Sequence, residues 1–205
     1  AFARSAPFRV IYNHHEQACA IAAEGLYRAT GRVGVVNITT GPGGLNTLTG
    51  VLGQWTDSIP AVYVSGQVKR TTTLGCCRAL PLRQLGDQEV DIIPVVRPLV
   101  KYAVSITDPL QIRKELERAF HLATTGRMGP VWIDVPMDIQ GASIDEASLE
   151  GFIPEEEGVA APSADFLLGL LDTSNVVFWA CVAGWFVFAT VLACRRPVLP
   201  ARLAG

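Results

Sequence analysis

The feature that most constrains the fold is a buried strand followed at once by a glycine-rich turn. Residues 33–39 are almost entirely apolar, as in a strand that is covered on both faces. Residues 41–44 read Gly-Pro-Gly-Gly and predict a tight loop. Apolar and small residues then recur at helical spacing over 45–55. This order of elements indicates an α/β protein whose sheet is covered by helices.

Strands and helices alternate along most of the remaining chain. Apolar runs bounded by turn residues indicate strands, and apolar residues at helical spacing indicate helices. The predicted strands are 8–12, 33–39, 61–65 and 131–135, and the predicted helices are 16–30, 45–55 and 109–125. Residues 67–90 show no clear period and predict a long loop. The expected fold is a mostly parallel sheet flanked by helices, with its ligand edge at the carboxyl ends of the strands.

Composition excludes several classes of partner. The chain has a formal net charge of -2 and 49% hydrophobic residues, so most of it should fold around a core. No run of Lys or Arg is long enough to neutralise a row of phosphates, which argues against nucleic acid and favours a small molecule. The five cysteines include no CxxC pair and no zinc-like spacing, so we expect no metal ligands among them and a reducing compartment, cytoplasm or organelle matrix.

Three polar groups of residues could carry chemistry. The first is His14-His15-Glu16-Gln17 at a switch from strand to helix, the second is the turn from Thr39 to Asn46, and the third is Asp87-Gln88-Glu89 in the long loop. Each also has an ordinary structural explanation: a first-turn glutamate stabilised by the helix dipole, a plain turn, and a solvated acidic loop. Taken singly, the groups leave these alternatives open.

Their order along residues 8–145 resembles the N-terminal domain of acetolactate synthase and related thiamine-diphosphate-dependent decarboligases. The family's motifs share a fixed order, beginning with a His-Glu-Gln sequence. They are matched by His15-Glu16-Gln17, Ala29-Thr30-Gly31, Gly34-Val35-Val36, Thr40-Gly41-Pro42-Gly43, Asn46, Asp57-Ser58-Ile59-Pro60, Ser65-Gly66-Gln67, Gln88-Glu89-Val90-Asp91, Lys101-Tyr102 and the segment 126–136. The resemblance implies the fold expected above and thiamine diphosphate as cofactor.

The resemblance also implies roles for particular residues. Glu16 would hydrogen-bond N1′ of the aminopyrimidine and so promote loss of the proton from thiazolium C2, which requires a carboxyl group whose pKa is raised in a dry cleft. The activated cofactor would act on a 2-keto acid such as pyruvate, the chemistry of branched-chain amino acid biosynthesis. The further cofactor-binding residues would be Gly41, Pro42, Gly43, Asn46 and Gln88.

The chain departs from the family pattern in three respects. The usual first strand and helix are mostly absent, Asp87 stands where acetolactate synthases commonly have Phe, and no Gly-Asp-Gly…Asn motif for Mg²⁺ and the diphosphate is found. We therefore expect Mg²⁺ to be supplied by a domain absent here, either in a homo-oligomer or on a partner chain, and the chain to be inactive alone. Some family members also bind FAD, which nothing in this sequence supports. The alternative is a non-catalytic binding or regulatory module that kept the fold, with or without attachment to a membrane.

The amino-acid composition changes after the first predicted domain. The predicted divisions are a pyrimidine-binding domain at 1–145, a linker at 146–165 and an apolar tail at 166–205. Residues 176–194 are apolar enough for a membrane helix that would span roughly 28 Å. Against membrane attachment, Arg195-Arg196 would lie on the wrong side for a tail-anchored domain, and Arg196-Pro197-Val198-Leu199 resembles the start of the family's central domain.

Overall fold

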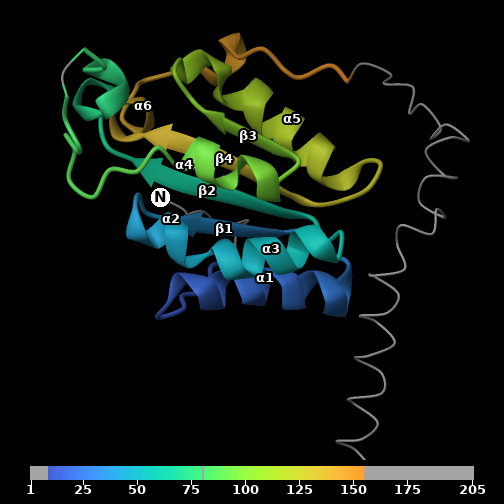
Figure 1. Ribbon diagram of the computed structural model, residues 1–205. Helices are drawn as coiled ribbons and strands as arrows, with labels where there is room; N and C mark the ends of the chain where they lie inside the picture. Colours follow the sequence, from blue (N-terminus) through green and yellow to red (C-terminus); the bar gives the residue numbers. More distant parts are fainter. Residues whose placement is uncertain (1–8, 80, 155–205) are drawn as a thin grey trace, which may run out of the picture. The chain divides into compact units, whose positions relative to one another are not determined.

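The computed structural model describes residues 9–79 and 81–154, which belong to one compact unit, Ala1–Glu155. At its centre is a four-stranded sheet in the order β1-β2-β4-β3, and every neighbouring pair is parallel (Figure 1). The strands are β1 (Gly34–Ile38), β2 (Ala61–Gln67), β3 (Tyr102–Ser105) and β4 (Pro130–Pro136). The predicted α/β class with a parallel sheet flanked by helices is confirmed for these residues.

Helices cover both faces of the sheet. They are α1 (Glu16–Thr30), α2 (Pro42–Asn46), α3 (Leu48–Thr56), α4 (Ile92–Val96), α5 (Ile112–Thr124) and α6 (Met137–Gln140), with 3-10 turns at 70–72, 74–76, 97–99, 109–111 and 146–148. On one face, Tyr63 and Trp132 stack with ring centroids 5.0 Å apart in a core shared with α1, α3 and α4. On the other face, Val62 and Ile133 pack with α5.

Small residues bring α1 unusually close to its neighbours. A Cβ atom placed on Gly34 would lie 2.7 Å from the Ala23 Cβ, and one placed on Gly50 would lie 2.5 Å from the Ala20 Cβ. The buried Gln54 amide donates to the Ala20 carbonyl over 2.8 Å and accepts a hydrogen bond from the Tyr63 hydroxyl over 2.8 Å. These contacts fix α1 against β1 and α3, and with it the position of Glu16 at the start of the helix.

The predicted strand at 8–12 is wrong for its described residues. Residues 9–12 form neither helix nor strand, and Ile11 and Tyr12 are 68% and 79% exposed. Their β-prone side chains have no neighbouring strand to pair with, and such residues form strands only where cross-strand packing supports them.

The turn after β1 is more helical than the sequence predicts. Gly41 makes the turn with φ +56°, and Pro42 then begins α2, because the fixed φ of proline suits the first position of a helix. The predicted helix at 45–55 is therefore divided between α2 and α3. The two helices meet at Thr47, whose buried hydroxyl donates to the Gly44 carbonyl over 2.7 Å.

Two elements near residue 100 are not predicted from the sequence. The apolar, β-branched run Ile92-Ile-Pro-Val-Val96 is more typical of a strand, yet it forms α4, with Pro94 in the first turn, where its missing N–H costs no hydrogen bond. Strand β3 has four residues, too few for a recognisable alternation. Both elements depend on the sheet onto which they pack.

The structure describes the predicted linker only as far as residue 154. Its first residues lie against α5, where the Phe152 backbone N–H donates to the Glu117 carboxylate over 2.7 Å and the Phe152 and His121 rings are 5.6 Å apart. The predicted tail at 166–205, with its apolar run at 176–194, lies outside the described residues. Among the helices that are described, none combines the length and the apolar content needed to cross a bilayer.

Candidate functional site

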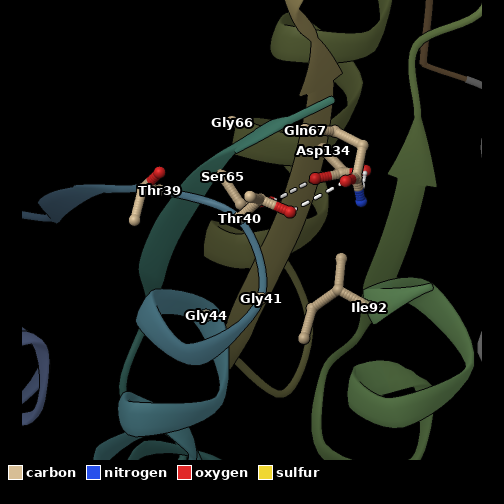
Figure 2. A pocket seen from close by; sticks show the side chains of 9 residues that line it. All are labelled: Thr39, Thr40, Gly41, Gly44, Ser65, Gly66, Gln67, Ile92 and Asp134. Atoms are coloured by element: carbon tan, nitrogen blue, oxygen red, sulfur yellow. Dashed lines mark hydrogen bonds between the residues drawn. The ribbon is translucent and has the colours of Figure 1, made fainter. Parts of the chain in front are cut away.

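A small pocket lies at the carboxyl ends of the strands, the edge at which the sequence predicts a ligand. It is bordered by the residues that follow β1, by the ends of β2 and β4, and by the start of α4 (Figure 2). In parallel sheets this edge collects the loops that leave successive strands. Here those loops are the glycine turn, Thr39 to Gly44, and the long loop that ends before α4.

Glu16 begins α1 and lies beside the glycine turn. One of its carboxylate oxygens accepts a hydrogen bond from the Asn46 side-chain amide over 3.1 Å. The other lies 3.6 Å from the point where a Cβ atom on Gly43 would be. The helix is capped by His15, whose ring Nδ1 accepts a hydrogen bond from the Gln17 N–H over 3.2 Å. Three of the predicted site residues, Glu16, Gly43 and Asn46, therefore lie close together.

The ionisation of Glu16 differs from the sequence-based expectation. Its pKa is lowered from the ordinary value by the hydrogen bond from its own backbone N–H, by the hydrogen bond from Asn46 and by the charge of His15. Partial burial acts in the opposite direction and is outweighed. The raised pKa expected of a carboxyl group in a dry cleft is therefore wrong for this chain by itself, in which Glu16 is only half-buried.

The glycines of the turn allow backbone segments to approach closely. A Cβ atom on Gly43 would lie 2.7 Å from the Thr39 methyl group, and one on Gly41 would lie 2.0 Å from the Gln88 carbonyl oxygen. Gly41 also has the positive φ that side chains disfavour. The turn is therefore packed against the backbone of the Gln88 segment. Pro42 is exposed at the start of α2.

Gln88 lies on the rim of this arrangement. Its side chain is exposed and its φ is +54°, a value that is uncommon for residues other than glycine. The neighbouring Glu89 accepts backbone hydrogen bonds from Leu74 over 2.6 Å and from Gly86 over 3.1 Å. The acidic part of the long loop therefore organises the loop internally, rather than simply facing solvent.

A buried polar group beneath the pocket was not among the predicted site residues. Ser65, Asp134 and Ser105 occupy paired register positions on β2, β4 and β3. The Ser65 hydroxyl donates to the Asp134 carboxylate over 2.6 Å and accepts a hydrogen bond from the Trp132 indole over 2.8 Å. A signal was present in the sequence, because Ser65 and Asp134 are polar residues near the ends of otherwise apolar strands.

The Asp134 carboxyl group has a strongly perturbed pKa. Only 3% of the residue is exposed, and this burial raises the pKa to about 6, although donors from Ser65, Gln67 and Ser105 act to lower it. The charge of Asp91 adds to the increase. A buried carboxyl group that titrates near neutrality beside a pocket is typical of functional sites, and also of structural networks.

The described residues do not provide a metal site. Within residues 9–79 and 81–154, no three side chains of the kinds His, Cys, Asp or Glu gather where they could hold one ion. A Mg²⁺ ion that bridges a diphosphate needs hard oxygen ligands in octahedral geometry. Among the described residues, such a set of ligands is not found.

Comparison with known proteins matches part of this chain to a known family. Residues 1–94 match the family model described as thiamine pyrophosphate enzyme, N-terminal TPP binding domain. The chain is 38% identical over 151 residues to acetolactate synthase of Arthrospira platensis, covering 70% of this chain and 24% of that protein. It is 44% identical over 125 residues to acetolactate synthase isozyme 3 large subunit of Escherichia coli, covering 61% of this chain and 20% of that protein.

The fold is consistent with the family match, which identifies an N-terminal domain of the thiamine pyrophosphate enzyme class. Within that class, the chain is an acetolactate-synthase-like N-terminal domain, and the resemblance first seen in its motifs is confirmed. The chain spans only about a quarter of the length of these relatives or less.

Proposed function

We propose that this chain binds thiamine diphosphate as the pyrimidine half of an acetolactate-synthase-like 2-keto-acid decarboligase, with Glu16 acting on the pyrimidine ring. The observation that carries the proposal is the position of the Glu16 carboxylate beside Gly43, oriented by Asn46 at the carboxyl edge of the sheet. The family model and the names of the relatives support the class of cofactor and of reaction.

The geometry suits a flat heterocycle with ring nitrogens. A carboxylate can hydrogen-bond a ring nitrogen, and a turn without side chains lets backbone lie against the ring face. Glu16 would hold the ring nitrogen, with Asn46 fixing the carboxylate. Gly41, Pro42 and Gly43 would border the ring, and Gln88 would face the substrate from the rim. When bound, the cofactor supplies the carbon nucleophile and the electron sink for decarboxylation of a keto acid such as pyruvate.

The lowered pKa of Glu16 in the chain by itself suggests how the site would work. A bound pyrimidine, together with a second domain that covers it, would remove water from the carboxylate and reverse the direction of the pKa shift. Glu16 would then take up a proton at neutral pH and share it with the ring nitrogen. Cofactor binding and protonation of Glu16 would therefore be coupled.

The rest of the cofactor would be held elsewhere. We propose that Mg²⁺ and the diphosphate bind to a separate diphosphate-binding domain, on a second subunit or on a part of the protein outside the residues described here. The chain alone would then be inactive towards keto acids.

The test is calorimetric titration of thiamine diphosphate and Mg²⁺ into the full chain mixed with a separately expressed diphosphate-binding domain from a relative. Titrations in buffers of different ionisation enthalpy measure the protons taken up on binding. The wild type should take up protons at neutral pH, and Glu16→Gln should take up fewer and bind more weakly. Glu24→Gln is the matched control, because Glu24 lies on the same helix and pairs with Arg28 outside the site.

Release of carbon dioxide from pyruvate by the same mixtures tests the reaction. We expect release with the wild type and with Glu24→Gln, and a loss of at least about a hundredfold with Glu16→Gln, the usual scale for removal of a general acid or base. Equal release from the Glu16 variant and the wild type would refute the role of Glu16. Binding without release from any mixture would favour a non-catalytic module that kept the fold.

A further inference from the structure

We propose that Gln67 is a positioning residue that, held by Asp134, fixes the glycine turn and the segment carrying Gln88 in a single arrangement. Its relevance to catalysis rests on the function proposed above. The arrangement itself is a property of the folded chain and can be tested without cofactor.

The Gln67 side chain joins two segments that are distant in sequence. It lies at the end of β2 and is 8% exposed. Its carbonyl oxygen accepts hydrogen bonds from the Thr40 hydroxyl over 2.8 Å and from the Val68 N–H over 3.0 Å. Its amide nitrogen donates to the Val90 carbonyl over 2.9 Å. One amide group thus holds both the start of the glycine turn and the end of the Gln88 segment. Figure 2 shows Gln67 together with Thr40 and Asp134.

Asp134 gives this amide only one favourable orientation. The Gln67 amide nitrogen also donates a hydrogen bond to the Asp134 carboxylate over 3.3 Å. The Ser105 hydroxyl donates to the same carboxylate oxygen over 3.4 Å. An ionised carboxylate only accepts hydrogen bonds, so it favours the nitrogen of Gln67 over the oxygen. If the amide were reversed, its oxygen would face both Asp134 and the Val90 carbonyl, and its nitrogen would face the Val68 N–H. Each end of the amide is therefore specified.

The two segments held by Gln67 are those that meet at the site. The Gly41 backbone lies so close to the Gln88 carbonyl that a Cβ atom there would overlap it, so the two segments have little freedom to shift relative to each other. The turn also carries Gly43, beside Glu16. Loss of the Gln67 hydrogen bonds would let the turn and the Gln88 segment move apart while the sheet beneath them stays intact.

Hydrogen exchange of the full chain, followed by mass spectrometry of its peptides, tests this link. Gly43 and Leu45 report on the turn, and Gly86 and Glu89 report on the Gln88 segment, because their amides are hydrogen-bonded within those segments. Helix α5 is the internal control. In Gln67→Leu, which keeps the size but not the hydrogen bonds, both reporter segments should exchange about tenfold faster or more, the factor expected for one lost buried hydrogen bond. Unchanged exchange in both would overturn the proposal.

Gln67→Glu adds a dependence on pH that a residue with only a packing role would not have. When both carboxyl groups are ionised, the carboxylate introduced at position 67 and that of Asp134 repel each other, with the charge of Asp91 nearby. Both reporter segments should therefore exchange faster than in the wild type at pH 7.5. At acidic pH, where the pair shares a proton, the ratio for the turn should fall towards one, whereas the Gln88 segment should stay fast because the shared proton leaves the Val90 carbonyl without a donor. A ratio for the turn that does not change with pH would contradict the role of Asp134.

The double variant Gln67→Glu with Asp134→Asn separates the two links. The amide introduced at position 134 can donate to the carboxylate introduced at position 67. That carboxylate can still accept from Thr40 and Val68, but nothing donates to the Val90 carbonyl. Exchange in the turn should return to the wild-type rate while exchange in the Gln88 segment stays fast. Recovery of both segments, or of neither, would overturn the proposed division.

None of these measurements uses thiamine diphosphate. Failure of cofactor binding would therefore refute the proposed function and leave the inference about Gln67 standing. Conversely, unchanged exchange in the Gln67 variants would overturn this inference without bearing on whether the chain binds the cofactor.

Discussion

The stability of Asp134→Asn relative to the wild type should increase as the pH rises from acidic to neutral. Asn has the shape of Asp but no charge to bury. The burial of Asp134 raises its pKa from 3.8 to about 6, so the folded state holds a proton on this group more tightly than the unfolded state does. Below pH 3.8 the group is protonated in both states, and between these values only the folded state is protonated. Above the raised pKa the folded state must keep a buried charge.

The size of the effect follows from the same pKa values. A difference of roughly two units, at about 1.36 kcal/mol per unit, is equivalent to ~3 kcal/mol. Because the folded-state pKa is the higher one, this contribution is fully present below the unfolded pKa and is lost as the pH rises to about 6. The amide of the variant does not titrate. It would face the Gln67 amide nitrogen, which adds a cost of ~1–3 kcal/mol, but this cost does not depend on pH.

The measurement is the free energy of unfolding in urea for the full chain and for Asp134→Asn, from pH 3.5 to pH 7.5. Subtracting the two curves removes the contributions of the other carboxyl groups. Asp138→Asn is the control, since Asp138 is also close to the end of β4 but has a lowered pKa because Arg70 donates hydrogen bonds to it. Its difference curve should have the opposite sign, because a lowered pKa gives stability that is lost as the pH falls.

Two outcomes would refute this reasoning. A difference between wild type and Asp134→Asn that is constant from pH 3.5 to pH 7.5 would mean that the carboxyl group titrates alike in the folded and unfolded states. A wild type that gains stability over the variant with rising pH would mean that the three donors around Asp134 outweigh its burial.

Three further predictions concern α1 and its contact with α3. Gly50→Ala should lower the free energy of unfolding by ~1–3 kcal/mol in chemical denaturation, because the new methyl group would lie 2.5 Å from the Ala20 Cβ. Adding Ala20→Gly to the same chain should recover part of that loss. Additive losses in the double variant would contradict the close contact. Gly31→Ala should raise the unfolding rate or lower the melting temperature by an amount equivalent to ~1 kcal/mol, since Gly31 ends α1 at φ +69° with open space around it. Gly25→Ala, inside the same helix and also in open space, should instead stabilise the chain by up to ~1 kcal/mol, and a loss there would refute the account of both glycines.

The parts of the fold predicted from sequence are those with a strong local pattern. Helix α5 and the strands β2 and β4 have clear apolar periodicity or continuous apolar runs, and they form as predicted. Residues 9–12 and α4 show the limit of this approach. Both have β-prone residues, but whether they form a strand depends on a partner strand or a packing surface contributed by distant parts of the chain. A local pattern carries no information about that partner.

The same distinction between local pattern and distant contacts applies to the site. Glu16, Gly43 and Asn46 were found because they occur in motifs at recognisable positions, and the structure brings them together. The ionisation of Glu16 could not be read from a motif, because it depends on how many donors reach the carboxylate and how much water remains around it.

The arrangement around Asp134 needs register as well as sequence. Ser65 and Ser105 meet this carboxylate only because β2 and β3 flank β4 with those residues in line. A polar residue at the end of an apolar strand is therefore informative only once its neighbours in the sheet are known. In this chain, Ser65 and Ser105 hold the Asp134 carboxylate in place. Asp134 in turn orients Gln67, which positions the glycine turn and the Gln88 segment.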